Sequence, residues 1–197
     1  MKVGEYSAYV FDLDGTLFII PIDWVRVRED LSKLMGVPMG NVPLFQKIGE
    51  TVTSAPSLKP RIFQLIDSYE LRASESARPL QGAEELLYSL FETARLALVT
   101  MQGRLATEDI LRRHKLMDLF ETIVTREDSV DRTEQIKLAL NRLAAKPGST
   151  LFAGDRMNDL VCGRRAGVNV AIVGREMQDT KPDYSFASLA EFKAYLD

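Results

Sequence analysis

Apolar residues in this chain follow two alternating patterns. Short, predominantly apolar runs at 96–99, 150–153 and 168–173 are separated by stretches in which apolar residues recur every three or four positions. The runs predict buried strands, and the spaced stretches predict amphipathic helices. Another apolar run at 8–11 and a weaker one at 122–124 extend the alternation. Because strands that are apolar on both faces are typical of parallel sheets covered by helices, the predicted fold class is α/β, a doubly wound Rossmann-like core.

The stretch from 21 to 78 breaks this alternation. It contains several prolines and no convincing strand, but it shows two helical faces, led by Trp24 and Ile62. This pattern predicts a small all-helical cap at 21–78, inserted after the first strand of a core made of 1–20 and 79–197. The pattern alone leaves open a second arrangement, in which the two helices simply extend the core.

Composition and charge narrow the function classes. Apolar residues make up 46% of the chain, and 25 Lys and Arg stand against 28 Asp and Glu, for a net charge of -3. Such an interspersed, nearly neutral balance argues against a nucleic-acid partner or a membrane surface. No signal peptide or membrane-length apolar run is visible, and Cys162 is the only cysteine. We therefore expect a cytoplasmic protein, while the oligomeric state stays open.

Residues with chemical potential follow the predicted strands. The first strand leads into Asp12-Leu13-Asp14-Gly15-Thr16-Leu17, the second into Thr100, and a later one into Gly154-Asp155-Arg156-Met157-Asn158-Asp159. The carboxyl ends of parallel strands form the ligand-binding edge of such a sheet, so these groups are expected to meet there.

Clustered carboxylates need a cation. Asp12 and Asp155 would repel each other unless a positive charge lay between them, and Mg²⁺ prefers oxygen ligands of this kind. A phosphate group resists attack by an anion for the same electrostatic reason. The carboxylates therefore predict Mg²⁺ as cofactor at this edge, where its charge would also ease an attack on a phosphate group.

The order and placement of these motifs resemble the haloacid dehalogenase-like hydrolase superfamily along essentially the whole chain. The helical insertion is similar to the helical-cap, phosphoglycolate phosphatase-like members. The resemblance implies a phosphatase that hydrolyses small phosphorylated metabolites through an aspartyl-phosphate intermediate. It implies Asp12 as the nucleophile and Asp14 as the general acid and base.

The resemblance also implies the remaining roles. The metal ligands would be Asp12, the main-chain carbonyl of Asp14, and Asp155, with Asp159 steadying the metal site. Thr100 would donate a hydrogen bond to the phosphoryl group.

Local chemistry adds four further candidates. Gly15 lets the chain turn away from the strand, and we expect the Thr16 hydroxyl to brace that loop. The N–H groups of Gln102 and Gly103 stand at a helix start, where they could help to hold a phosphate.

The chain departs from the family pattern at two positions. Met101 replaces an Asn that commonly follows the threonine, and no lysine stands where the third motif has one. Arg132 lies at a matching distance before Asp155, and a guanidinium can neutralise both the phosphate and the nucleophile. Lys137 is the competitor, and we favour Arg132.

Other functions stay open or are disfavoured. A phosphomutase uses the same aspartyl chemistry, and a non-catalytic relative could bind a phosphorylated ligand. The resemblance also disfavours a carbon-halide dehalogenase, because family members with that activity generally lack the second aspartate, which is present here as Asp14. His114 is the only histidine and lies late in a predicted helix between Arg113 and Lys115, which disfavours a Ser-His-Asp triad. No phosphate-binding loop of the Walker type precedes a lysine, which disfavours an ATP-using kinase.

Overall fold

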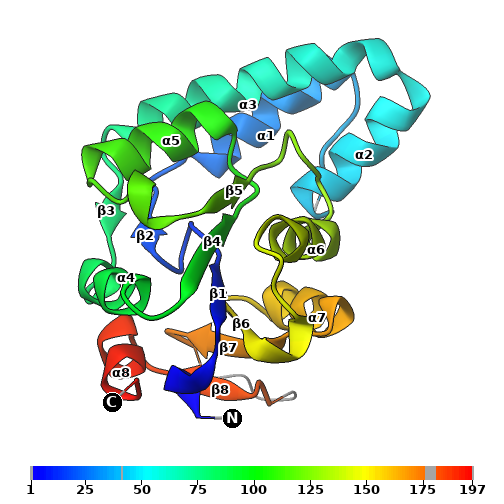
Figure 1. The fold of residues 1–197 in the computed structure, drawn as a ribbon. Coiled ribbons are helices and arrows are strands. Elements are labelled where there is room, and N and C mark those ends of the chain that lie inside the picture. Colours follow the sequence, from blue (N-terminus) through cyan, green and yellow to red (C-terminus); the bar gives the residue numbers. More distant parts are fainter. Residues whose placement is uncertain (1, 41, 176–180, 197) are drawn as a thin grey trace.

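A parallel sheet of six strands forms the centre of the computed structural model, which describes residues 2–40, 42–175 and 181–196 (Figure 1). The strands lie in the order β5-β4-β1-β6-β7-β8, and all neighbouring pairs are parallel. The predicted doubly wound α/β core is therefore confirmed. The strands are β1 (Ala8–Phe11), β4 (Arg95–Val99), β5 (Thr122–Val124), β6 (Thr150–Gly154), β7 (Asn169–Val173) and β8 (Tyr184–Phe186).

Helices cover both faces of this sheet. Successive residues of a strand point to opposite faces, so Tyr9 and Phe11 join one apolar cluster while Ala8 and Val10 join another. The first cluster includes α4 (Ala83–Phe91), α5 (Arg104–Arg113) and α8 (Leu189–Ala194); the second includes α6 (Arg132–Arg142) and α7 (Met157–Ala166). Burial on both faces explains why the central strands are continuously apolar.

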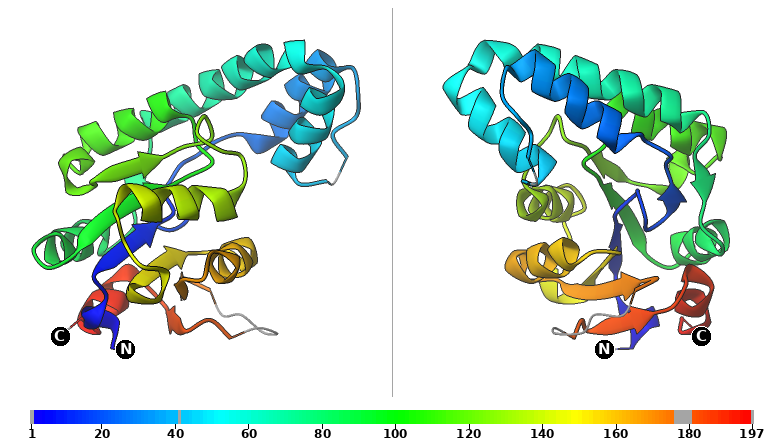
Figure 2. Two further views of the ribbon diagram at one scale, coloured as in Figure 1. Left: turned by 45° about the vertical axis from the view of Figure 1, so that its right-hand side comes forward. Right: turned by 180° about the vertical axis from the view of Figure 1, so that it is seen from behind.

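The helical insertion lies above the carboxyl ends of the central strands (Figure 2). It consists of α1 (Trp24–Met35), α2 (Leu44–Ser54) and α3 (Lys59–Ser74). Val27 and Leu31 of α1 pack with Ile62 and Ile66 of α3 in an apolar cluster of their own, against which Trp24 is partly buried. The two predicted helical faces therefore pack on each other.

A small antiparallel pair joins the two ends of this insertion. β2 (Phe18–Ile19) pairs with β3 (Arg78–Pro79), with Phe18 opposite Pro79. Phe18 also forms a bridge with Asp14, so the insertion leaves the core beside the first motif. The sequence did not predict this pair, because strands of two residues carry no measurable periodicity.

Helix α3 is also attached to the core. The Ser74 hydroxyl donates to Asp109 of α5 at 2.7 Å, and Ala73 belongs to the main apolar cluster of the core. The last turn of α3 therefore packs with the core, while its first half packs with α1 and α2.

The sequence pattern did not predict several of the observed helices and strands. Helix α2 lies in a proline-rich stretch, and β8 with α8 follows the last clear apolar run. Short 3-10 helices lie at Val3–Glu5, Pro56–Leu58, Met117–Leu119 and Pro147–Ser149. Within the described ranges, none of the helices combines the length and apolar character needed to cross a bilayer.

Candidate active site

The strand register brings the predicted residues to one edge of the sheet. Phe11 lies opposite Leu98 of β4 and opposite Ala153 of β6, so the next positions along each strand converge. Asp12 thereby lies between the two strands whose ends carry Thr100 and Asp155. The chain order reverses on the two sides of β1, which makes this edge the switch point where α/β sheets bind ligands.

Three buried carboxylates meet at this edge. Asp12, Asp155 and Asp159 each offer an oxygen atom within 4.8 Å of the others. The pKa of Asp12 is raised to about 7, because burial and the neighbouring charges of Asp159 and Asp155 raise it by more than Arg132 lowers it. Burial also raises the pKa of Asp155. Burial and the charges of neighbouring carboxylates therefore both oppose the charged forms of Asp12 and Asp155.

Arg132 supplies one positive charge to this cluster. Its Nη2 lies 2.8 Å from Asp12 Oδ1, its Nε lies 3.6 Å from Asp159 Oδ1, and its Nη1 donates to the carbonyl of Val99 at 2.8 Å. Burial by itself would lower the pKa of Arg132, but Asp12 and Asp159 raise it, so the guanidinium stays charged.

Lys137 lies elsewhere. Its ammonium pairs with Glu134 at 2.8 Å on the solvent-exposed side of α6. Of the two cations proposed for the third motif, the structure brings only Arg132 to the carboxylates.

The loop after β1 passes directly over Asp155. Gly15 has a φ of +83°, and a Cβ placed there would lie 2.7 Å from Asp155 Oδ2. Gly15 therefore meets both the backbone and the space requirement of this turn. Thr16 is fully buried, but its hydroxyl has no hydrogen-bond partner among the described residues, so the expected bracing bond is not seen.

Asp14 lies on the same loop, on the side that is partly open to solvent. Its Oδ1 accepts the N–H of Ile20 at 3.3 Å. Burial raises the pKa of Asp14, although the Ile20 hydrogen bond and Arg156 lower it. A carboxyl group with a raised pKa carries a proton more readily, which suits a proton donor.

The loop after β4 has its polar groups engaged. The buried Thr100 Oγ accepts the N–H of Gln102 at 3.1 Å, and the N–H of Gly103 donates to Glu70 of α3 at 2.9 Å. Both N–H groups that were expected at a phosphate therefore have protein partners here, and their role in phosphate binding stays a prediction. Gln102 Oε1 is buried without a partner among the described residues.

Sequence reasoning missed three residues that hold this loop. Gln135 Nε2 donates to the carbonyl of Thr100 at 2.8 Å, while Glu70 and Arg126 form a buried ion pair beside Gly103. Glu70 continues the buried stripe of α3 that includes Ile66. The available signal was Glu70 itself, a carboxylate at a core-facing helical position. Carboxylates are rarely buried without a partner, so this position predicts a buried cation beside it.

The site fits a divalent cation with oxygen ligands. Asp155 Oδ1 is buried and lacks a hydrogen-bond partner among the described residues; Arg156 Nε lies 3.6 Å from it and Arg175 Nη2 lies 3.4 Å from Oδ2, so neither arginine is as close as a metal ligand would be. Asp12, Asp155 and Asp159 could hold the ion together with the predicted main-chain carbonyl of Asp14. A cation there would also offset the repulsion within the cluster.

Comparisons with known proteins agree with this geometry. Residues 26–173 match the model of the family described as haloacid dehalogenase-like hydrolase. Pyrophosphatase PpaX from Halalkalibacterium halodurans is 27% identical over an alignment of 207 positions, which covers 95% of this chain and 95% of that protein. An N-acetylmuramic acid 6-phosphate phosphatase from Pseudomonas aeruginosa is 25% identical over an alignment of 193 positions, which covers 88% of this chain and 84% of the relative. A haloacid dehalogenase-like hydrolase from Streptococcus pneumoniae has the same fold, with a TM-score of 0.73 at 20% identity over 98% of this chain and 99% of its own.

Proposed function

The chain belongs to the haloacid dehalogenase-like hydrolases, and from this premise we propose that it is a magnesium-dependent phosphatase of small phosphate monoesters with Asp12 as its nucleophile. The observation that carries the proposal is the buried trio of carboxylates with Arg132 paired to Asp12 at 2.8 Å. Two curated relatives are named as a pyrophosphatase and as a sugar phosphate phosphatase, which supports phosphate ester or anhydride chemistry.

In the first step, the carboxylate of Asp12 attacks phosphorus and the ester oxygen leaves. This forms an aspartyl-phosphate and breaks the phosphorus–oxygen bond of the substrate. Asp14, whose pKa is raised by burial, donates its proton to the leaving oxygen. Arg132 stabilises the negative charge that gathers on the nucleophile and the phosphoryl group.

In the second step, Asp14 takes a proton from water, and that water attacks the aspartyl-phosphate. Inorganic phosphate leaves and Asp12 returns to its starting form. Thr100 would hold a phosphoryl oxygen through both steps. When bound, Mg²⁺ supplies charge neutralisation and orientation of the phosphoryl group, held by Asp12, Asp14, Asp155 and Asp159.

We propose that the chain divides functionally into a core of 1–20 and 79–197 and a cap of 21–78. The separate apolar cluster of α1, α2 and α3 supports this division, as does the β2–β3 pair that brings the two attachment points together. A cap above the carboxyl ends of the strands favours small phosphorylated metabolites over phosphoproteins, because it limits the size of what can enter.

Turnover of p-nitrophenyl phosphate by the purified protein tests this function. We expect hydrolysis in magnesium, loss of hydrolysis with a chelator and recovery when magnesium is restored. The Asp12→Asn variant is the matched control for a contaminating phosphatase. Absence of turnover with every ester tried, in a protein that still binds phosphate, would instead favour a phosphate-binding relative without catalysis.

A further inference from the structure

A fully buried ion pair lies outside the proposed reaction centre and joins the insertion to the core. Arg126, two residues beyond β5, points its guanidinium at Glu70 of α3, and both side chains have 0% exposure. Nη1 and Nη2 of Arg126 each donate to one oxygen of Glu70 at 2.7 Å, which makes the pair bidentate. Asp67, one turn earlier on α3, is a second partner of the same guanidinium.

This pair forms hydrogen bonds with the main chain of the loop that follows Thr100. Arg126 Nη1 donates to the carbonyl of Met101 at 3.0 Å, and the N–H of Gly103 donates to Glu70 at 2.9 Å. The main-chain N–H of Arg126 donates to the carbonyl of Gln102 at 3.4 Å. All three residues after Thr100 are therefore held by the ion pair or by the backbone beside it.

Gly103 is the position where loop and ion pair come closest. A Cβ at Gly103 would meet an Asp67 carboxylate oxygen first and would also lie 2.6 Å from Arg126 Nη2 and 3.1 Å from Glu70 Oε2, so a larger residue must displace these side chains or the loop. Phe45 of α2 and Phe63 of α3 lie beside the guanidinium, with ring centres 6.0 and 5.4 Å from its carbon. The insertion therefore closes the pair off from water.

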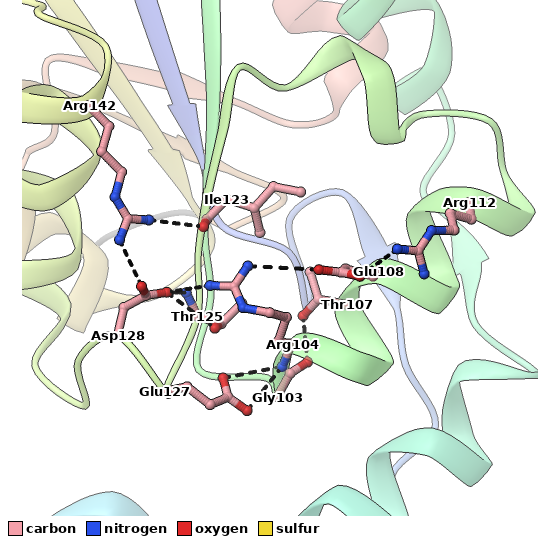
Figure 3. Close-up of polar contacts among 10 residues, drawn as sticks. All are labelled: Gly103, Arg104, Thr107, Glu108, Arg112, Ile123, Thr125, Glu127, Asp128 and Arg142. Carbon is pink, nitrogen blue, oxygen red and sulfur yellow. Dashed lines mark hydrogen bonds and ion pairs between the residues drawn. The ribbon is translucent and has the colours of Figure 1, made fainter.

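A second set of contacts fixes the base of Arg126. Figure 3 shows Glu127 accepting the N–H of Arg104, at 3.1 Å, and Asp128 accepting from the side chains of Arg104 and Arg142, each at 2.7 Å. Asp128 also accepts the N–H of Thr125 at 2.9 Å. The loop at 125–128 is thus attached to the start of α5 through Arg104 and to the end of α6 through Arg142. These contacts restrain the main chain of Arg126 while its guanidinium donates to the Met101 carbonyl.

Stability alone gives a weak reason for such a pair. Removing two charges from water is expensive, and apolar replacements of similar volume are often neutral or stabilising. A bidentate pair does fix geometry, because both partners are planar and accept few alternative arrangements.

We propose that Arg126 and Glu70 are positioning residues that hold the 101–103 main chain so that Thr100 faces the phosphoryl group. The inference rests on the role proposed above for Thr100 and extends it, because Glu70 belongs to the insertion. Helix α3 therefore helps to build the phosphate-binding loop of the core as well as covering it. The loop is correctly placed only when α3 is seated on Arg126.

The central test is the double variant Arg126→Met/Glu70→Met in the full chain. It removes both buried charges together, so we expect it to fold. With p-nitrophenyl phosphate, we expect kcat to fall by about tenfold or more, and the affinity for inorganic phosphate, measured calorimetrically in magnesium, to fall by a similar factor. The magnesium concentration for half-maximal activity should stay unchanged, since no metal ligand is touched. A general loosening of the fold would shift all three quantities.

Further variants separate positioning from simple attachment of α3. Ser74→Ala removes the bond from α3 to Asp109 of α5 without touching the loop, and it should leave kcat and phosphate affinity unchanged. Gly103→Ala keeps both charges, but its methyl group separates the loop from the ion pair. It should therefore lower kcat and phosphate affinity as the double variant does. Arg126→Lys keeps one charge without the bidentate geometry and should give an intermediate kcat.

A folded double variant with wild-type kcat and wild-type phosphate affinity would overturn the proposal and leave the phosphatase activity standing. If the wild type binds phosphate but turns over no ester, the phosphate affinities of the variants decide the positioning role by themselves. A wild type that neither binds phosphate nor hydrolyses an ester would remove both proposals. If the double variant does not fold, Gly103→Ala decides, and unchanged phosphate affinity in that variant counts against positioning.

Discussion

Asp12 lies where burial opposes its charged form, and this position shapes what it can do. Burial raises its pKa to about 7, while Arg132 at 2.8 Å favours the carboxylate. We predict that Asp12→Asn abolishes turnover and leaves the fold intact, because an amide of the same shape is a poor nucleophile. Rapid quench with labelled substrate should trap phosphate on the wild type and none on the variant. Undiminished activity in Asp12→Asn would exclude Asp12 as the nucleophile.

The choice between Arg132 and Lys137 is also made at the residue scale. Arg132 is buried against Asp12, whereas Lys137 pairs with Glu134 at the surface. We expect Arg132→Ala to lower kcat by about tenfold or more, because a charge in a water-excluded site stabilises the transition state strongly. Arg132→Lys should retain part of the activity, and Lys137→Ala should be nearly silent in the same assay. The opposite ranking of the two alanine variants would move the third motif to Lys137.

Helices α1, α2 and α3 form a packing unit, and its integrity is testable at the scale of elements. Leu31 is fully buried in their shared cluster, so Leu31→Ala should destabilise by about 2 to 5 kcal/mol. If 21–78 is a separate cap, the Leu31→Ala variant should show faster hydrogen exchange at the amides of α1 to α3, while exchange in β1, β4 and β6 stays slow. Leu98→Ala, in the core cluster, is the matched control and should raise exchange in the sheet. Equal acceleration in both regions by Leu31→Ala would argue against a separate cap.

At the scale of the whole molecule, we expect metal binding and folding to be coupled. Three buried carboxylates repel in the absence of a cation, so magnesium should raise the unfolding temperature, by the equivalent of about 2.7 kcal/mol at a hundred times its Kd. Asp155→Asn removes one charge, and the metal-free variant should therefore unfold at a higher temperature than the metal-free wild type. The same variant should gain little from magnesium. Calorimetric melts with and without a chelator measure both effects, and a metal-free variant that melts below the wild type would show that repulsion is not the controlling effect.

Local patterns in the sequence were sufficient for the fold class and for the carboxylate cluster. Continuous apolar runs report burial on both faces of a strand, and parallel strands place their carboxyl ends on one edge, so Asp12, Thr100 and Asp155 had to converge. The helical faces led by Trp24 and Ile62 were visible for the same reason, since helical periodicity is a local property. Elements too short to show a period, including β2, β3 and the 3-10 helices, were not visible.

Only the tertiary structure decided which cation meets Asp12 and what holds the loop after Thr100. Arg132 and Lys137 lie five positions apart on one helix, and their burial depends on how that helix packs against β4, β5 and α7 rather than on its own sequence. Glu70 and Arg126 are separated by 56 residues and become partners only when α3 packs against α5, next to the loop that follows β5. Periodicity along the chain records which side of an element is buried, but it carries no information on which distant element covers that side, and this pairing is what sets the electrostatics of the site.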